Sequence, residues 1–246
     1  MARIRGSRDV TSPAVRWQRS PRNPLLEYFE AKPDRLVHKW MHYFDIYHRH
    51  FAPWRGRPAT IVEIGVYHGG SLLMWKKYFG RRARIFGIDV DPRCKELAEP
   101  QVEIIIGDQE DREFLGRVRE QVGPIDVLIE DGGHTMGQQI ATFEEMFPAV
   151  KVGGVYLVED LHTSYWEEFG GGYRVPGTFI EYVKDIVDQL NAHHSRDRER
   201  HPVTDLTRMV GGMHVYDSVV VFDRAELPEP TVRKSGRPSF DDEDEE

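Results

Sequence analysis

The 246-residue sequence predicts an α/β protein with a Rossmann-like fold, built on a mostly parallel sheet that ends in a C-terminal antiparallel hairpin. Short apolar runs that alternate with helical segments are typical of parallel strands buried on both faces, and three occur, at residues 61–64, 102–106 and 125–129. The first run leads into a glycine-rich turn and then a helical segment, the order found in nucleotide-binding α/β units. Two later apolar runs, Met213–Tyr216 and Val219–Phe222, flank Asp217-Ser218 and predict the hairpin.

The composition divides the chain into three parts. Residues 1–24 hold six arginines and one acid, so we expect a basic flexible arm there, either solvated or in contact with phosphate. Residues 25–227 are predicted to form one α/β domain. Residues 228–246 contain prolines and end in six acidic residues, which predicts an acidic disordered tail.

Charge and cysteine content limit the partners and the compartment. The net charge of −8 comes mostly from the tail, because the chain without Asp241–Glu246 carries only −2. This bulk charge argues against a nucleic-acid partner. Cys94 is the single cysteine, so an intrachain disulfide is excluded, and the sequence has no apolar run suited to export or membrane insertion. We therefore expect a cytoplasmic protein with no membrane partner.

The glycine-rich turn has the spacing Gly65-x-x-x-Gly69-Gly70 and lacks the Gly-x-Gly-x-x-Gly pattern that holds a pyrophosphate. Tyr67 stands where that pattern has its second glycine, which argues against a dinucleotide-dependent oxidoreductase. One alternative is a strand–helix turn without any ligand. With an acid two residues before the turn, however, the stretch resembles the first motif of class I S-adenosylmethionine (SAM) methyltransferases, whose loop wraps the amino-acid part of the cofactor. The resemblance implies cofactor contacts for Glu63, Gly65, Tyr67, Gly69 and Ser71.

Polar residues also follow the next strands, at the point where each strand ends. Asp89 lies 24 residues after the turn glycine, close to the roughly 20-residue offset at which an acid accepts hydrogen bonds from ribose hydroxyls. Asp108 and Gln109 follow the strand at 102–106, where such folds place adenine, and either side chain can bond the exocyclic amine. Glu130 follows the next strand and completes the candidate cofactor-binding set.

Three further carboxylates predict a metal site. Asp131 follows the fourth strand, and Glu159 and Asp160 follow the fifth, so the three converge if these strands are neighbours. Their mutual repulsion calls for protonation or a bridging cation, and oxygen-only ligands favour Mg²⁺. Such a metal lowers the pKa of a bound substrate hydroxyl, and His134 is near enough in sequence to act as the general base. The alternative is a helix cap at Asp131 and solvated loop acids at the other two positions.

Two segments outside the strands are candidates for covering the site. Leu36–Phe51 predicts one amphipathic helix, which either only packs or covers the cofactor pocket with Tyr43 or His48. Its expected apolar face comprises Val37, Trp40, Met41, Phe44 and Tyr47. Leu161–Gly177 places aromatic residues around three glycines, which fits either a mobile lid with an acceptor pocket or a surface loop. The acceptor or lid candidates there are His162, for which a structural role is an equal alternative, Tyr165 and Trp166.

Two motifs taken together resemble a known family. Glu-Asp-Gly-Gly-His at 130–134 and Val-Glu-Asp-Leu-His-Thr-Ser-Tyr-Trp at 158–166 are similar to motifs of the metal-dependent SAM O-methyltransferases that act on macrolide and rhamnosyl sugars. The resemblance covers roughly residues 36–223. It implies a class I methyltransferase fold with a seven-stranded sheet, His134 as the catalytic base, and Mg²⁺ bound by Asp131, Glu159 and Asp160.

The resemblance also implies an activity. We expect a homo-oligomeric enzyme that uses SAM and Mg²⁺ to O-methylate a hydroxyl on a sugar, carried by a small-molecule glycoside or a nucleotide-sugar. A rival within the enzyme class is methylation of a non-sugar diol such as a catechol or a polyketide hydroxyl, because the metal chemistry suits both. A rival from another class is a SAM-binding protein without catalysis.

Overall fold

The computed structural model describes residues 23–31 and 34–239. The predicted basic arm therefore lies outside the described residues except for its last two, which begin the folded part. Asn23 caps helix α1 (Pro24–Glu30) by accepting hydrogen bonds from the N–H groups of Leu25 and Leu26. At the other end, residues 228–239 form no helix or strand, and the rest of the predicted acidic tail lies outside the described residues.

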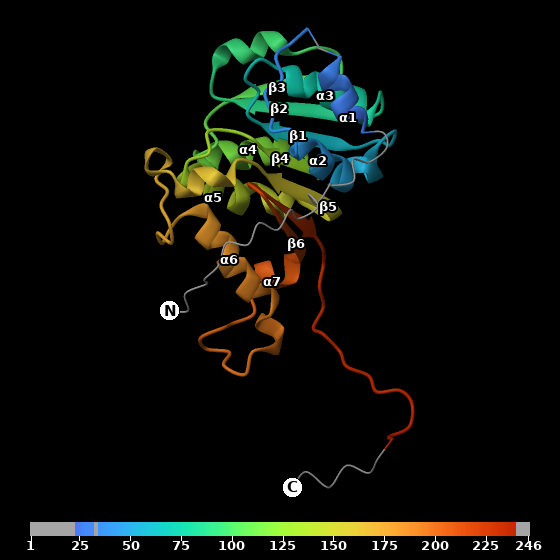
Figure 1. Ribbon diagram of the computed structural model, residues 1–246, viewed down its shortest axis with the longest axis vertical. Helices are drawn as coiled ribbons and strands as arrows, with labels where there is room; N and C mark the ends of the chain where they lie inside the picture. The colour runs from blue at the N-terminus through green and yellow to red at the C-terminus, as the bar shows by residue number, and fades with distance from the viewer. Residues whose placement is uncertain (1–22, 32–33, 240–246) are drawn as a thin grey trace, which may run out of the picture.

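The core of the protein is one seven-stranded sheet in the order β3-β2-β1-β4-β5-β7-β6 (Figure 1). Strands β1 to β5 are parallel, whereas β7 runs antiparallel to both β5 and β6. The mostly parallel sheet with a C-terminal antiparallel hairpin is thus confirmed. The strands are β1 (Thr60–Ile64), β2 (Arg84–Asp89), β3 (Val102–Ile106), β4 (Ile125–Glu130), β5 (Val150–Val158), β6 (Val210–Tyr216) and β7 (Val219–Arg224).

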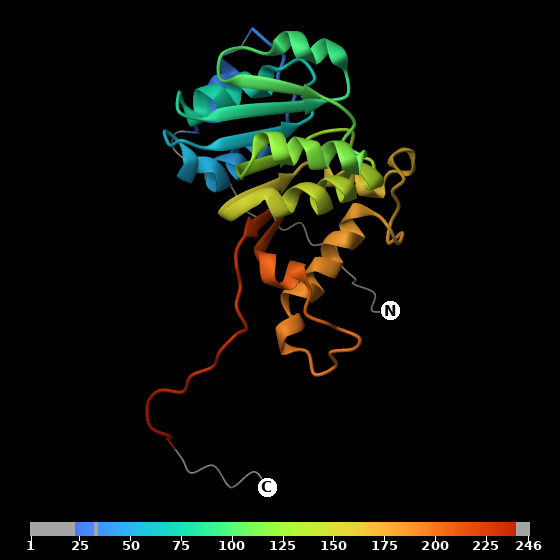
Figure 2. The same cartoon turned by 180° about the vertical axis from the view of Figure 1, so that it is seen from behind.

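Helices cover both faces of the sheet, as the two opposite views show (Figures 1 and 2). Successive side chains of a strand point to opposite faces, so β1 contributes Ile61 to one hydrophobic core and Val62 to the other. On the first face lie α1, α2 (Tyr43–Phe51) and α3 (Gly70–Phe79). On the second lie α4 (Arg112–Val122), α5 (Met136–Met146) and α6 (Phe179–Leu190), with the short α7 (Asp205–Met209) next to α6.

The predicted helix over Leu36–Phe51 is wrong in its first half, because α2 begins only at Tyr43. Residues 36–40 form no helix and cross the glycine-rich turn, where a Cβ atom on Gly70 would lie 2.2 Å from the Leu36 carbonyl oxygen. Of the expected apolar face, Trp40 and Met41 are at least half exposed, as is Leu36 itself. The apolar spacing there falls on a connecting segment, residues 34–42, made of bends, irregular backbone and a turn, and not on a helix surface.

Short 3₁₀ helices form several of the connections. The segment after β2 forms a 3₁₀ helix, η2 (Pro92–Leu97), and Asp91 caps it by accepting from the Arg93 N–H at 2.9 Å. The predicted lid loop begins with η4 (Leu161–Tyr165) and η5 (Glu167–Phe169). The other turns are η1 (Ala52–Trp54), η3 (Phe147–Ala149) and η6 (Ala192–His194).

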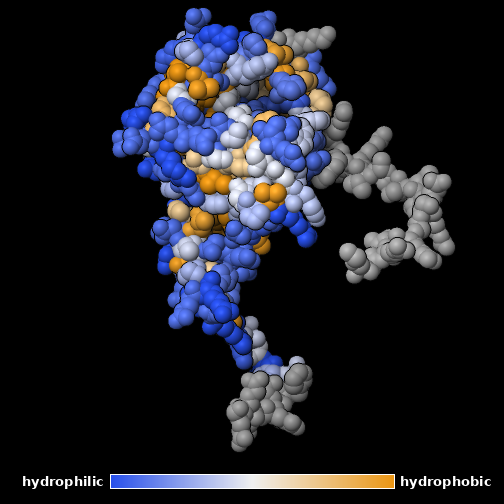
Figure 3. Space-filling view, turned by 90° about the vertical axis from the view of Figure 1, so that its left-hand side faces the viewer, coloured by the Kyte–Doolittle hydropathy of each residue, from blue (hydrophilic) through white to orange (hydrophobic). Residues whose placement is uncertain are grey.

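The surface is mainly polar. The face drawn in Figure 3 is largely hydrophilic, with small apolar areas between the polar ones. Over the described ranges 23–31 and 34–239, none of the helices combines the length and the apolar character that crossing a membrane requires.

Candidate active site

Backbone hydrogen bonds continue past the carboxyl ends of the central strands and align the residues that follow them. Asp131 N–H donates to the Ile64 carbonyl at 2.9 Å, and Glu159 N–H donates to the Glu130 carbonyl at 3.0 Å. Gly65 has φ +94°, and a Cβ atom on it would lie 1.9 Å from the Asp131 carbonyl oxygen. The turn therefore requires glycine, because the chain after β4 passes directly against it.

A cavity of about 540 Å³ lies beyond the ends of β1 to β4. Six of the residues assigned to the cofactor and metal from the sequence line it: Gly65, Tyr67, Asp89, Asp108, Gln109 and Asp131. Four others assigned to the cofactor do not line it: Glu63, Gly69, Ser71 and Glu130. Half of the twelve residues assigned to the cofactor and metal thus line one cavity, since Glu159 and Asp160 do not line it either. The cofactor contacts themselves stay predictions.

Asp89 holds the glycine-rich turn in shape. Its Oδ2 atom accepts hydrogen bonds from the N–H groups of Val66 at 2.8 Å and Tyr67 at 3.0 Å, and its Oδ1 accepts from Asp91 N–H at 2.8 Å. Tyr67 has the left-handed φ of +51°, which is unfavourable for a tyrosine, and the Asp89 carboxylate stabilises this conformation. A carboxylate offers about four lone-pair directions, so Asp89 keeps acceptor capacity toward the cavity.

Glu63 and Ser71 form the support beneath the turn. The Glu63 carboxylate is buried and accepts hydrogen bonds from the Ser71 hydroxyl at 2.7 Å and the Trp75 indole N–H at 2.9 Å. Burial raises the pKa of Glu63 to about 7, against the opposing effect of the Lys39 charge. These bonds join β1 to the first turns of α3 and place the helix start.

Gln109 and Glu130 form a second support on the far side of the cavity. The Gln109 amide N–H donates to Glu130 Oε1 at 2.8 Å, and its amide oxygen accepts from Gly133 N–H at 2.8 Å. Glu130 is fully buried, and burial raises its pKa. The pair fixes the Gly132-Gly133 segment, so Gln109 positions the loop that carries the next acid.

Lys39 is the functional residue that the sequence reasoning missed. Its ammonium contacts the Asp131 carboxylate directly, lies 2.9 Å from Glu159 Oε2 and 4.0 Å from Glu63 Oε1, and the side chain is only 3% exposed. Burial alone would lower the pKa of Lys39, but the three carboxylates raise it above its usual value. Burial and the nearby Asp131 charge raise the pKa of Glu159 well above its usual value. A single lysine inside a predicted helix gave no signal of this position.

His134 and Asp160 complete the group. His134 Nε2 lies 3.5 Å from Asp160 Oδ2 and 3.8 Å from Asp131 Oδ1. Its buried Nδ1 has no hydrogen-bond partner among the residues that the structure describes. His134 and Asp160 have φ values of +58° and +55°, a strain of the kind that clusters at functional sites. Thr163 ties the two loops together through its hydroxyl, which donates to the His134 carbonyl at 3.1 Å.

Two tyrosines of α2 orient the acid pair. Tyr43 donates its hydroxyl to Asp160 Oδ1 at 2.7 Å, and Tyr47 donates to Glu159 Oε1 at 2.6 Å; both rings are buried. Tyr43 therefore contacts an acid and does not line the cavity, in contrast to the alternative in which it covers the cofactor pocket. His48 pairs with the Tyr78 hydroxyl at 2.8 Å instead of covering the pocket.

The sequence of the chain is similar to those of known proteins. Residues 62–161 match a family model described as a methyltransferase domain. The chain contains a methyltransferase domain. It is 35% identical over 240 residues to the 8-demethyl-8-alpha-L-rhamnosyl tetracenomycin-C 2'-O-methyltransferase of Streptomyces olivaceus, a match covering 88% of this chain and 63% of that protein. It is 33% identical over 214 residues to the mycinamicin VI 2''-O-methyltransferase of Micromonospora griseorubida, covering 82% of this chain and 53% of that protein.

Solved structures agree with the fold of this methyltransferase domain. The MycE methyltransferase from the mycinamycin biosynthetic pathway, in complex with Mg and SAH, matches with a TM-score of 0.72 at 32% identity, over 82% of this chain and 54% of that one. A second crystal form matches with a TM-score of 0.74. The predicted class I methyltransferase fold is confirmed. The chain spans roughly half to two thirds of the length of the curated relatives described here.

The acids of the methyltransferase domain fit a divalent cation. The Lys39 ammonium, itself a cation, lies between the carboxylates of Asp131 and Glu159, so the structure already places positive charge there. One atom each from Asp131, His134 and Asp160 lie within 4.8 Å of one another. The carboxylates of Asp131, Glu159 and Asp160 are the hard oxygen donors that Mg²⁺ prefers. That the three hold such an ion stays a prediction, because the group within 4.8 Å contains Asp131 and Asp160 with His134 but not Glu159.

An aromatic surface lies beside the acids. His162 Nδ1 is 4.0 Å from Asp160 Oδ1, and its ring packs edge-on against Trp40, with ring centres 6.0 Å apart, and against Trp166, with ring centres 4.7 Å apart. Tyr165 and Trp166 are each 45% exposed. The loop that carries them is held by turns, with Gly171 N–H donating to the Trp166 carbonyl at 2.9 Å. His162 also bonds Ser218 of the β6–β7 turn, so it has a structural contact as well as a place beside the acids.

The hydrogen bonds that Asp89 accepts from the glycine-rich turn lead to a prediction for cofactor binding. Asp89→Ala is expected to weaken S-adenosylhomocysteine binding by about 10–100-fold, because hydrogen bonds to a charged group contribute about 1.5–3 kcal/mol and the Tyr67 conformation loses its support. Titration calorimetry measures this. Asp126→Ala is the matched control, since Asp126 also accepts a backbone N–H (Thr60, 2.7 Å) but is not among the cavity-lining residues. Unchanged affinity in Asp89→Ala would contradict the assignment.

Proposed function

We propose that the protein is a SAM- and Mg²⁺-dependent O-methyltransferase whose acceptor is a sugar hydroxyl of a small-molecule glycoside. The observation that carries the proposal is the convergence of Asp131, Glu159, Asp160 and His134 at the edge of the cavity. The relatives named above, which are O-methyltransferases of rhamnosyl tetracenomycin and mycinamicin, support the sugar acceptor.

The residues of the chain have separable tasks in this reaction. The cavity beyond β1 to β4 binds the cofactor, with Asp89 and Gln109 on its walls. SAM would supply an electrophilic methyl group. Mg²⁺ held by the acids would lower the pKa of the acceptor hydroxyl. His134 Nε2 faces the acids and accepts the proton that the hydroxyl loses as the new carbon–oxygen bond forms. Tyr43 and Tyr47 keep the acid pair oriented.

The exposed aromatic surface supports an acceptor with apolar faces. Trp40, Tyr165 and Trp166 are half exposed, and their rings offer packing area to the C–H face of a sugar or to an aglycone. A catechol or polyketide hydroxyl would use the same acids, but the relatives, which act on glycosides, support the sugar. The homo-oligomeric state and the cytoplasmic location stay predictions.

Calorimetry on metal-free protein tests the proposal. We expect binding of S-adenosylhomocysteine but not of NAD, followed by binding of Mg²⁺ to the loaded protein. Asp131→Asn should lose the Mg²⁺ step, whereas Asp111→Asn, which alters only the cap of α4, should keep it. NAD binding, or Mg²⁺ binding unchanged in Asp131→Asn, would overturn the proposal.

Turnover then separates the acceptor classes. Isotope-labelled SAM is offered with a panel of rhamnosides and macrolide glycosides and, separately, with catechols. Transfer to a glycoside supports the sugar acceptor, and transfer confined to catechols would favour the non-sugar diol. Binding of cofactor and metal without transfer to any member would favour a non-catalytic SAM-binding protein.

A further inference from the structure

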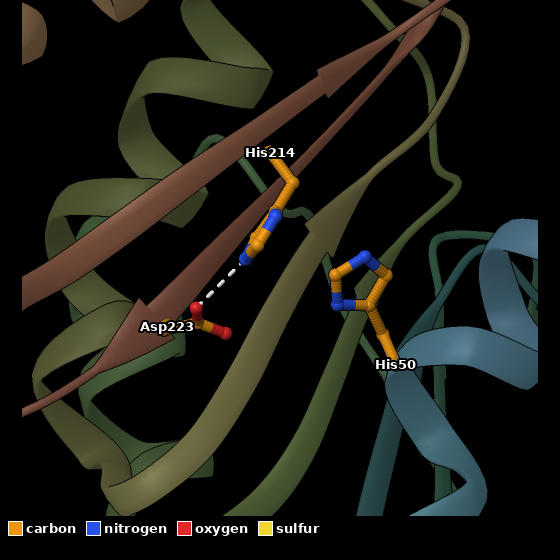
Figure 4. A group of neighbouring side chains, drawn as sticks. All are labelled: His50, His214 and Asp223. Carbon is orange, nitrogen blue, oxygen red and sulfur yellow. Dashed lines mark hydrogen bonds and ion pairs between the residues drawn. The ribbon is translucent and has the colours of Figure 1, made fainter.

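A second group of side chains that can bind a metal lies at the C-terminal end of α2, away from the proposed active site. His50 is in the last turn of α2, His214 is on β6, and Asp223 is on β7 (Figure 4). His214 pairs with Val221 in the antiparallel ladder, and Asp223 lies two residues further along β7 on the same face. Val221 belongs to the core that α2 covers, so both sheet residues face that helix.

The three side chains converge. His214 Nε2 lies 2.9 Å from Asp223 Oδ2, and the ring centres of His50 and His214 are 4.7 Å apart. One ligand atom from each residue lies within 4.8 Å of the other two. The side chains of His214 and Asp223 are both 44% exposed, so an ion from solvent reaches them without opening the fold. In Figure 4 one nitrogen of the His50 ring faces His214 and Asp223.

The contacts of the His50 ring favour binding of a metal ion over a role as a protonated surface histidine. Its Nε2 lies 2.8 Å from the Tyr216 hydroxyl, which leaves the other ring nitrogen directed to the group. Metal-binding histidines commonly engage their second nitrogen with such a partner, which fixes the ring orientation. Burial and the neighbouring His214 lower the pKa of His50 to about 4, so the ring is neutral near pH 7.

We propose that His50, His214 and Asp223 bind a late first-row divalent transition metal ion of the Zn²⁺ class. Two imidazoles and one carboxylate are typical ligands of such an ion, whereas Mg²⁺ prefers oxygen atoms alone. In a tetrahedral zinc site the metal–nitrogen bonds are about 2.0–2.1 Å, so ligand atoms lie roughly 3.3 Å apart. Rotation of the half-exposed side chains brings the three ligand atoms to that spacing and leaves a fourth position for water.

A metal there would join the helix that orients the catalytic acids to the edge of the sheet. Its ligands come from α2 and from both strands of the β6–β7 hairpin. The same helix presents Tyr43 and Tyr47 to Asp160 and Glu159, and the turn of the same hairpin bonds His162 through Ser218. A metal at this site would therefore link α2 to the β6–β7 hairpin, and both elements position active-site residues. Its binding can be measured without any methyl-transfer assay.

The test uses the full chain without a histidine tag, stripped of metal and kept in excess Mg²⁺ so that the acids of the first site are occupied. Zn²⁺ is titrated by calorimetry, and Co²⁺ absorption in the visible range reports nitrogen ligation. We expect a single Zn²⁺ per chain and a rise in melting temperature. His214→Ala and Asp223→Asn should each weaken Zn²⁺ binding by about 10–100-fold or more and abolish that rise.

Two control variants make the result decisive. His194→Ala removes an exposed histidine of η6, and Asp131→Asn alters the first site; both should bind Zn²⁺ as the wild type does. Circular dichroism establishes that each variant is folded. Zn²⁺ binding that persists in both His214→Ala and Asp223→Asn, or that disappears in Asp131→Asn, would overturn the proposal. Absence of micromolar Zn²⁺ binding to the wild type would show that the group is only a histidine–aspartate hydrogen bond.

Discussion

Replacing His134 with alanine is expected to lower the rate of methyl transfer by about 10²–10⁴-fold, the range that general acid–base catalysis contributes. The reason is geometric. His134 Nε2 lies 3.5 Å and 3.8 Å from carboxylate oxygens of Asp160 and Asp131, so it borders the position at which an acceptor hydroxyl would meet the acids. Its side chain does not line the cavity, and the affinity for S-adenosylhomocysteine should stay within a few-fold of wild type. Single-turnover transfer and calorimetry on the same preparation measure the two quantities.

The backbone at His134 requires a second variant. The residue has φ +58°, a conformation that asparagine adopts more readily than alanine does, so His134→Asn separates backbone strain from loss of the base. Both variants should be equally slow. His162→Ala is the control, since His162 also lies near Asp160 but bonds to Ser218, and it should change KM more than kcat. Transfer by His134→Asn within about tenfold of wild type would contradict the general-base role.

The sequence placed the polar residues at the carboxyl ends of the strands near one another for a physical reason. A parallel sheet places the carboxyl ends of its strands at one edge, so any polar residue directly after β1, β2, β3, β4 or β5 lies near that edge. Gly65, Asp89, Gln109, Asp131 and Glu159 were found this way, and the strand order sets their neighbours. The polar residues inside the strand ends, such as Glu63 and Glu130, share the edge but point into the protein, which strand position alone does not distinguish.

The segment before α2 shows why the rest of the site was not predicted. Apolar residues at helical spacing over 36–51 favoured one helix, yet residues 36–40 form no helix and pass over the glycine-rich turn instead. The close contact between the Leu36 carbonyl and Gly70 and the burial of the Lys39 ammonium both come from residues distant in sequence. The left-handed conformations of Tyr67, His134 and Asp160 are likewise fixed by loop contacts and leave no trace in a single sequence.

Lys39→Met is the second change with a large expected effect, and it acts on stability. In metal-free buffer the free energy of unfolding should fall by about 3–5 kcal/mol, because removing one partner leaves the remaining buried charges uncompensated. Glu159 and Glu63 are almost fully buried, and Asp131 is partly buried beside them. Methionine keeps most of the length and the apolar stem of lysine, so the loss reports the charge more than the packing. Urea unfolding at pH 7.5 measures it.

The same variant tests whether the lysine and a metal compete for the acids. The Lys39 ammonium contacts Asp131 and Glu159, two of the three residues proposed to hold Mg²⁺, so an ion must displace or share them. Lys39→Met should therefore bind Mg²⁺ more tightly than the wild type, and Mg²⁺ should restore part of its lost stability. Lys77→Met, which removes an exposed lysine of α3, should change the unfolding free energy by no more than about 0.5 kcal/mol. Weaker Mg²⁺ binding in Lys39→Met would mean that the ammonium supports the metal site instead of competing for it.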